Sequence, residues 1–134
     1  MRKAVGLLEE STACCDGFLL NICLSYGSRD EIVEACKAVA RDYKNNKFCS
    51  SSGKAVDIDE LNEESFGSYL KTSLSPDPDI LIRTSGEHRI SNFLLYQMAY
   101  TELFFIDKYW PEVTKDDLVA IFGSFAERKR RYGK

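Results

Sequence analysis

Long apolar runs are missing from this sequence of 134 residues. None approaches the roughly 20 residues that a membrane-spanning helix requires, and residues 1–10 lack the apolar core of a signal peptide. A basic charge excess is missing as well, because the net formal charge is −3 at pH 7. Nothing in the overall balance therefore predicts binding to nucleic acid. These absences favour a cytoplasmic protein in which any anion-binding site is local.

Paired cysteine spacings are also missing. The five cysteines lie at positions 14, 15, 23, 36 and 49, an odd number with no Cys-x-x-Cys spacing. A disulfide framework and a structural zinc site are therefore not expected. We expect the thiols to be reduced and buried, as free cysteines usually are in a reducing compartment.

Several common catalytic signatures are absent. The chain has no Gly-x-x-x-x-Gly-Lys-Ser/Thr loop and no Gly-x-Gly-x-x-Gly fingerprint, the glycine-rich segments that bind nucleotide phosphates. The single histidine, His88, would have to serve every role that a histidine plays, so no Ser/His/Asp or Cys/His nucleophile set can be assigned. Covalent catalysis is therefore not expected.

What the sequence does contain is a series of helix and strand patterns. Short apolar runs bounded by turn residues predict strands, and apolar residues at helical spacing behind a capping residue predict helices. The predicted strands are 18–24, 79–84 and 103–106. The predicted helices are 2–15, one opened by a capping box of Ser28 and Glu31, one capped by Asn62, an apolar one capped by Ser91 or Asn92, and a last one opened by a capping box of Thr114 and Asp117 and buried through Leu118, Ile121, Phe122 and Phe125.

The order of these elements predicts the fold class. Strands alternating with helices predict an α/β fold, a parallel sheet with flanking helices. Three strands are few, however, where a sheet has roughly 5–6 on average. The strands also look apolar on both faces, which requires neighbours that the sequence does not supply. We therefore interpret 1–134 as a single partial domain whose amino-terminal strands are missing.

A cluster of charged and polar residues follows the second predicted strand. Arg83 ends that strand, and the loop after it carries Arg89 and Ser91. Ligands of open parallel sheets bind beyond the carboxyl ends of the strands. Two guanidinium groups, a hydroxyl and the amino end of the next helix would form a diphosphate site there. The alternative, which spacing alone leaves open, is that the arginines form structural salt bridges with nearby acids. Those acids are Asp79, Glu87 and Glu102.

His88 and Glu102 are the candidate metal ligands. Mg²⁺ prefers oxygen ligands and is usually shared between a carboxylate and phosphate oxygens. Glu102 opens its strand, so it belongs to the opposite sheet edge from Arg83 unless the fold or a dimer brings the two together. A lone histidine is more often a hydrogen-bonding loop residue than a ligand, so a structural role for His88 also stays open.

Three stretches of the sequence resemble a known family. Arg83-Thr-Ser-Gly-Glu-His-Arg-Ile-Ser-Asn-Phe-Leu-Leu-Tyr-Gln97, then Ala99-Tyr-Thr-Glu-Leu-Phe-Phe105 and Trp110-Pro-Glu112, resemble the carboxyl-terminal signature of the cis-prenyltransferases. These are the undecaprenyl diphosphate synthase and dehydrodolichyl diphosphate synthase enzymes. The stretch from Asn21 to Val33 resembles the family's central strand–turn–helix, and Arg131-Tyr-Gly133 resembles its terminal Arg-x-Gly element.

The resemblance implies a fold, a reaction and roles for particular residues. Family members condense isopentenyl diphosphate with an allylic diphosphate, usually farnesyl diphosphate, with Mg²⁺. The product is a long-chain polyprenyl diphosphate for dolichol or polyprenyl carrier synthesis. By this likeness Arg83, Arg89 and Ser91 bind isopentenyl diphosphate, and His88 and Glu102 belong to the Mg²⁺–diphosphate site. The other matching positions have supporting or dimer-contributed roles; they are Asp79, Glu87, Glu112, Arg131 and Gly133.

The same resemblance implies partners and a location. It implies a homodimer, or a heterodimer with a related subunit, in which the element from Arg131 to Gly133 reaches the partner's active site. It implies no nucleic acid. It also implies a cytoplasmic enzyme with peripheral association, through its polyprenyl product, at the cytosolic face of a membrane. In a eukaryote that membrane is the endoplasmic reticulum.

The sequence departs from the family in one large respect. The family's amino-terminal strand, with its Met-Asp-Gly-Asn-Gly-Arg-Trp motif, is absent. With it go the catalytic aspartate that holds Mg²⁺ and the groups that hold the allylic diphosphate. An inactive truncated fragment of the enzyme is the simplest interpretation, and turnover by this chain alone is not expected. A non-catalytic partner subunit is one alternative, and a generic phosphate-binding α/β module is another.

Overall fold

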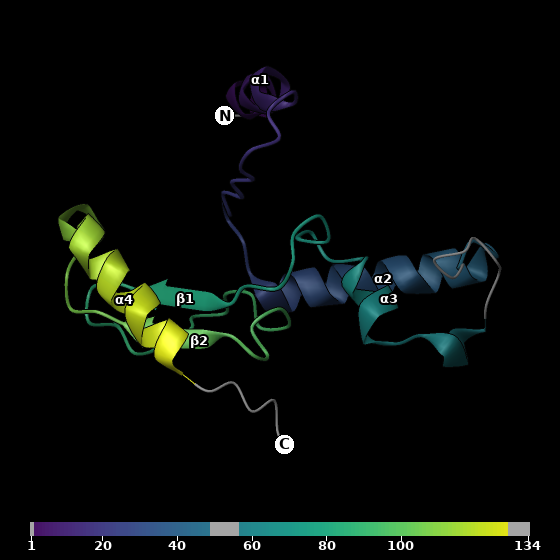
Figure 1. Cartoon of the computed structure of the whole chain (residues 1–134). Helices are drawn as coiled ribbons and strands as arrows, with labels where there is room; N and C mark the ends of the chain where they lie inside the picture. The colour runs from purple at the N-terminus through teal and green to yellow at the C-terminus, as the bar shows by residue number, and fades with distance from the viewer. Residues whose placement is uncertain (1, 49–56, 129–134) are drawn as a thin grey trace.

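The computed structural model describes residues 2–48 and 57–128. In Figure 1, α4 lies with β1 and β2, α2 extends to the opposite side, and α1 stands apart at the end of a linker. Within the described ranges no helix combines the length and the apolarity needed to cross a membrane. The elements in chain order are α1 (Arg2–Thr12), α2 (Ser28–Lys44), the 3₁₀ turn η1 (Ile58–Glu60), α3 (Glu63–Gly67), β1 (Ile80–Arg83), β2 (Glu102–Phe105), the 3₁₀ turn η2 (Trp110–Glu112) and α4 (Lys115–Glu127).

β1 and β2 form a two-stranded parallel sheet. The register places Glu102 opposite Ile80 and Phe105 opposite Arg83. The ladder continues before the strands, where the Asp79 carbonyl accepts from the Glu102 N–H at 3.0 Å. The two strands predicted in this region are confirmed, and so is the parallel α/β class of the fold.

Helix α4 is held to the sheet at both of its ends. Its predicted capping box is confirmed, because the Thr114 hydroxyl accepts from the Asp117 N–H. At this end Lys108, just after β2, donates to the Asp117 carboxylate at 2.7 Å. At the other end Arg128 pairs with Glu102, the first residue of β2. Helix α4 therefore runs antiparallel to the strands.

The apolar face of α4 is less buried than predicted. Ile121 is buried, with 7% exposure, and Leu118 and Phe125 are half-buried. Phe122, however, is 52% exposed, so its predicted burial is wrong. A sheet of two strands is too narrow to cover a helix face that wide, since neighbouring strands lie only about 4.8 Å apart.

The helix predicted to start at Ser91 or Asn92 is wrong. Consecutive turns occupy 91–100 instead. Ser91, Asn92 and Leu94 have φ angles of 52°, 62° and 44°, left-handed conformations that do not continue an α-helix. Asn92 is used elsewhere. Its carbonyl accepts from the Ser28 N–H at 2.8 Å, and its Oδ1 accepts from the Arg29 N–H at 2.9 Å.

Asn92 therefore caps α2 from a distance of more than sixty positions along the chain. The predicted capping box of Ser28 and Glu31 is wrong, because the N-cap of α2 is Gly27 and no side chain of the helix itself caps it. A side chain at this position would be crowded, since a Cβ on Gly27 would lie 2.8 Å from Asn92 Nδ2. The predicted cap at Asn62 is confirmed, with Oδ1 accepting from the Ser65 N–H at 3.0 Å.

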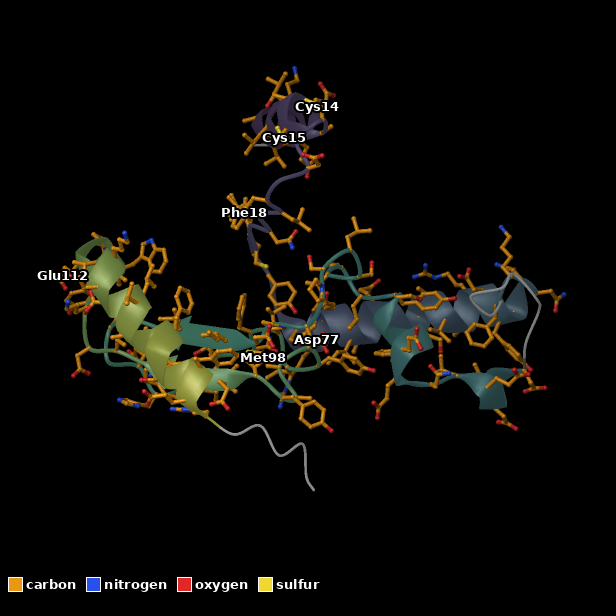
Figure 2. All side chains as sticks on the ribbon, in the orientation of Figure 1. Cys14, Cys15, Phe18, Asp77, Met98 and Glu112 are labelled. Carbon is orange, nitrogen blue, oxygen red and sulfur yellow. The ribbon has the colours of Figure 1, made fainter. Side chains whose placement is uncertain are left out.

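The strand predicted at 18–24 is also wrong in this structure. The segment is part of an exposed linker between α1 and α2. Phe18 is 83% exposed and projects from the linker (Figure 2). A strand requires a hydrogen-bonded neighbour, and none is present for this segment within the described residues.

Helix α1 ends at Thr12 rather than at residue 15, and it does not pack on the sheet (Figure 1). This position explains why the prediction of buried thiols is wrong. Cys14 and Cys15 follow α1, Cys23 lies in the linker and Cys36 lies on the outer side of α2, and all four are exposed. Cys49 lies outside the described residues.

Candidate functional site

Arg83 lies at the carboxyl end of β1, as the sequence predicts. Its backbone carbonyl accepts from the Ile106 N–H at 2.9 Å, which fixes the strand end. The residue is half-buried, and it forms no salt bridge with any residue in 2–48 or 57–128. A half-buried guanidinium without a carboxylate partner is suited to bind an anion.

Two left-handed residues turn the chain immediately after β1. Ser85 and Gly86 have φ angles of 70° and 65°, and the Gly86 N–H donates to the Ile106 carbonyl at 3.0 Å. A Cβ on Gly86 would lie 3.3 Å from Asp107 Oδ1. The turn brings the His88 ring to 5.0 Å from the Phe105 ring, centroid to centroid. His88 therefore lies at the same end of the sheet as Arg83.

Arg89 follows in the same loop, but it has a partner. Its guanidinium pairs with the Glu87 carboxylate, which is the structural salt bridge left open by the sequence. The two side chains are 64% and 37% exposed, and a pair this exposed is worth only about 0–1 kcal/mol. A diphosphate, with its higher charge, can compete for Arg89.

Ser91 is the third residue predicted for the anion site. The residue is exposed and follows Arg89 closely in the loop. The helix whose amino end was expected to add backbone N–H groups is absent, because 91–100 forms turns. The helix amino end predicted to contribute to the anion site is therefore not formed by 91–100 in this structure.

Glu102 lies at the opposite end of the sheet from Arg83. The register aligns Glu102 with Ile80, three positions before Arg83, a separation of about 10 Å along the strand. Its carboxylate pairs with Arg128, whose guanidinium also lies 4.7 Å from the centre of the Phe104 ring. In this structure Glu102 therefore stabilises the contact between α4 and β2, and its role as a metal ligand stays a prediction.

The structure does not bring the two candidate metal ligands together. His88 packs near the end of β2, whereas Glu102 begins the same strand. Among the described residues, no group of three His, Cys, Asp or Glu side chains could hold a metal ion. The residues in this part of the chain therefore do not form a complete Mg²⁺ site.

The supporting residues fall in three places. Asp79 lies beside Glu102 through the backbone hydrogen bond that precedes β1. Glu112 lies at the periphery near the start of α4 (Figure 2) and accepts from the Tyr109 N–H at 2.8 Å, which caps η2. Arg131 and Gly133 lie outside the described residues.

A buried polar network that the sequence did not reveal supports the site segment. The Glu31 carboxylate is 1% exposed. It accepts from the Tyr26 hydroxyl, from the Lys71 N–H at 2.8 Å and from Gln97 Nε2 at 3.1 Å. Burial, followed by the hydrogen bond to Glu31, raises the pKa of Tyr26 to about 12. Ser28 Oγ also accepts from the Leu95 N–H at 2.9 Å.

This network and the Asn92 cap fix the segment 91–97 to α2. Ser28 and Glu31 have the spacing of a capping box, so the sequence predicts a hydrogen bond between neighbours in place of these distant contacts. Burial distinguishes a local helix cap from a contact with distant residues, since buried polar groups require partners. Within the described residues, Gln97 Oε1 is buried without a hydrogen-bond partner.

Similarity to known proteins identifies the family of this chain. Residues 1–133 match the family model described as "Putative undecaprenyl diphosphate synthase". The chain belongs to this family. Relatives within it include the tritrans,polycis-undecaprenyl-diphosphate synthase (geranylgeranyl-diphosphate specific) of Thermoplasma acidophilum, 44% identical over 134 residues, and the isoprenyl transferase of Bacillus thuringiensis subsp. konkukian, 47% identical over 133 residues. The resemblance to the cis-prenyltransferases is confirmed.

The undecaprenyl diphosphate synthase family also supplies similar solved structures. Lavandulyl diphosphate synthase from Lavandula x intermedia, in complex with dimethylallyl diphosphate, is 30% identical with a TM-score of 0.88. A probable undecaprenyl diphosphate synthase from Campylobacter jejuni is 34% identical with a TM-score of 0.79. Each match covers 99% of this chain, but 54% and 56% of those chains. The two sequence relatives are covered to 49% and 47%, so the chain spans about half the length of the curated relatives it matches.

Proposed function

We propose that this chain carries the isopentenyl diphosphate site of a cis-prenyl chain-elongating enzyme. The reaction would condense isopentenyl diphosphate with an allylic diphosphate and give a long-chain polyprenyl diphosphate. The observation that carries the proposal is Arg83, a half-buried guanidinium without a salt-bridge partner in the described residues, at the carboxyl end of a parallel strand. Its position in a chain of the prenyltransferase family gives that anion site a substrate class.

The roles of the loop residues follow from their chemistry. Arg83 and Arg89 would bind the diphosphate oxygens through charge-assisted hydrogen bonds, and Arg89 would exchange Glu87 for the ligand. The Ser91 hydroxyl would donate to a remaining oxygen. His88, held against Phe105, would donate a ring N–H at the same strand end. Together these groups would orient isopentenyl diphosphate for attack on the allylic partner.

The allylic substrate is a separate part of the proposal. Farnesyl diphosphate is the expected partner, but the Thermoplasma acidophilum relative is named for geranylgeranyl diphosphate, and the Lavandula x intermedia structure holds dimethylallyl diphosphate. We therefore propose an allylic diphosphate of this class without choosing its chain length. Competition between farnesyl and geranylgeranyl diphosphate in an active assembly would decide the chain length, and use of neither substrate would contradict the proposal.

We propose that any Mg²⁺ in an active assembly is held by groups other than the residues that the structure describes. His88 and Glu102 lie at opposite ends of β2, and Glu102 is occupied by Arg128. We infer that isopentenyl diphosphate binds to this chain without Mg²⁺ as an obligatory component. Titrations with and without MgCl₂ test this inference, and a strict requirement for the ion would contradict it.

Assembly and location extend the proposal. We propose a homodimer or a heterodimer with a related subunit, a cytoplasmic location, and peripheral membrane association through the polyprenyl product, whether it serves dolichol or another carrier. The half-length match favours a chain that is inactive alone. A non-catalytic partner subunit is the second candidate, favoured by the separation of the two metal-ligand candidates. Turnover by an assembly that is lost when Arg83 is replaced would exclude the non-catalytic partner subunit.

The proposal is tested by replacing Arg83. We expect Arg83→Ala to weaken binding of isopentenyl diphosphate about 10-fold or more, since a charge-assisted hydrogen bond is worth about 1.5–3 kcal/mol. Isothermal titration calorimetry measures the dissociation constant. The matched control is Arg41→Ala, which removes an exposed arginine from α2 and should leave binding unchanged. Equal affinities for wild type and Arg83→Ala would contradict the proposed site.

A further inference from the structure

The turn that follows α1 carries two adjacent thiols. Cys14 and Cys15 come directly after the helix, and both are free and exposed. The turn is closed by the Cys15 N–H, which donates to the Thr12 carbonyl at 2.9 Å. Figure 2 shows both cysteines at the end of α1. The proposed diphosphate chemistry uses neither thiol, so the pair is available for a role of its own.

A disulfide between these two sulfurs is unfavourable. The peptide bond that joins Cys14 to Cys15 is trans, and a trans peptide places successive Cα atoms about 3.8 Å apart. Residues joined by a disulfide usually have their Cα atoms about 4.4–6.8 Å apart. The two thiols are therefore better suited to share a ligand than to bond with each other.

The number of ligands selects the class of ion. Thiolates are soft ligands that favour Cu⁺, Zn²⁺ and iron–sulfur clusters. Structural zinc sites and iron–sulfur clusters take about four protein ligands. In 2–48 and 57–128 no group of three His, Cys, Asp or Glu side chains could hold a metal ion, so no third ligand joins this pair there. Two sulfurs alone suit Cu⁺, a soft monovalent ion that accepts two thiolates.

The charge around the thiols also favours a cation. Glu9, Glu10 and Asp16 lie within a few positions of the pair, and all three are exposed. No lysine or arginine occurs between Lys3 and Arg29. This local negative charge attracts a metal cation and disfavours an anionic thiol reagent such as glutathione disulfide. Metal binding is therefore the better match to the pair than thiol–disulfide exchange.

We propose that Cys14 and Cys15 bind one Cu⁺ ion through two thiolates. Binding replaces two S–H bonds with two Cu–S bonds and releases two protons, with no change in oxidation state. The site lies at the end of α1, which stands apart from the sheet that carries Arg83 (Figure 1). The proposal is therefore independent of the diphosphate site and of the proposed function.

Anaerobic titration of the reduced 134-residue chain with Cu⁺ tests the proposal. Bathocuproine disulfonate, a chelator that becomes coloured with Cu⁺, competes for the ion. We expect the chain to withhold one Cu⁺ from the chelator, and we expect Cys14→Ser and Cys15→Ser each to lose that site. The matched controls are Cys23→Ser and Cys36→Ser, which remove exposed thiols elsewhere and should retain it. Copper K-edge absorption should show sulfur neighbours only.

Several results would overturn the proposal. They are transfer of all Cu⁺ to the chelator, a site that survives replacement of both Cys14 and Cys15, and a site lost equally in Cys23→Ser. Zn²⁺ bound as tightly as Cu⁺, or one ion shared by two chains in light scattering, would also contradict it by showing further ligands. The metal-free variants should melt at the wild-type temperature, because these thiols are exposed. A loss of binding is then a loss of ligands and not of folding.

Discussion

Arg83 and Arg89 lie near each other in sequence but in different electrostatic environments. Arg83 has no carboxylate partner within the described residues, whereas Arg89 is paired with Glu87. The sequence predicted both arginines as candidates and could not separate them, because ion pairing depends on how the loop turns at Ser85 and Gly86. At the scale of single residues, this difference leads to a prediction for Glu87, whose carboxylate competes with a diphosphate for Arg89.

Removing the competing carboxylate should strengthen ligand binding. We expect Glu87→Gln to raise the affinity for isopentenyl diphosphate by about 2- to 5-fold, because it frees Arg89 from an exposed pair worth about 0–1 kcal/mol. Calorimetric titration gives the affinity. Glu34→Gln, which breaks an exposed pair with Lys37 on α2, is the control and should have no effect. A weaker affinity for Glu87→Gln would show that Glu87 itself holds the ligand or the loop.

A second residue-scale prediction concerns acid stability. The hydrogen bonds from Lys108, and then those from Thr114, lower the pKa of Asp117 from 3.8 to about 2. A lowered pKa in the folded state contributes stability above the unfolded value, which is lost as the pH falls through the folded one. The melting temperature of Asp117→Asn should therefore lie furthest below wild type above pH 4, with the gap closing toward pH 2. Asp116→Asn is the control from the same turn. A gap that is constant with pH would contradict the assigned pKa.

At the scale of elements, some helices and strands could be predicted from the sequence and others could not. The capping box of α4 was predicted correctly because Thr114 and Asp117 are close in sequence. The strands β1 and β2 were also predicted correctly, because each is a short apolar run and the two pair with each other. The helix predicted at 91–100 does not form, since Asn92 caps α2 and does not cap a helix of its own segment. A propensity scale cannot anticipate a cap donated from elsewhere in the chain.

The contact between Gly27 and Asn92 can be tested by a double-mutant cycle. Asn92→Ala should destabilise the fold by about 1 kcal/mol, the usual cost of losing an N-cap. Gly27→Ala should also destabilise it, since its Cβ would meet Asn92 Nδ2. Because both act on one contact, the double variant should cost at least about 0.5 kcal/mol less than the sum. Urea denaturation measures each free energy of unfolding, with Asn45→Ala at the other end of α2 as control. Strict additivity would contradict the distant cap.

At the scale of the whole molecule, the sequence predicted a parallel sheet of three strands, and the described residues form a parallel sheet of two. The apolar segment 18–24 was predicted to be a strand from its own residues, but strand pairing depends on residues elsewhere, and no strand forms there within the described residues. The same limit applies to the site. Arg83 and His88 lie at one end of the sheet, whereas Glu102 lies at the other. The catalytic aspartate that the family resemblance implies stays a prediction.

Under the proposed function this chain would carry one half of a two-substrate site, and ligand selectivity tests that proposal most directly. Equilibrium dialysis of the 134-residue chain with radiolabelled isopentenyl, farnesyl and geranylgeranyl diphosphate would measure all three affinities, and product extraction from a mixture would measure turnover. We predict that isopentenyl diphosphate binds at least about 10-fold more tightly than either allylic diphosphate, with no condensation product. Equal or tighter binding of an allylic diphosphate, or turnover by the chain alone, would contradict the account.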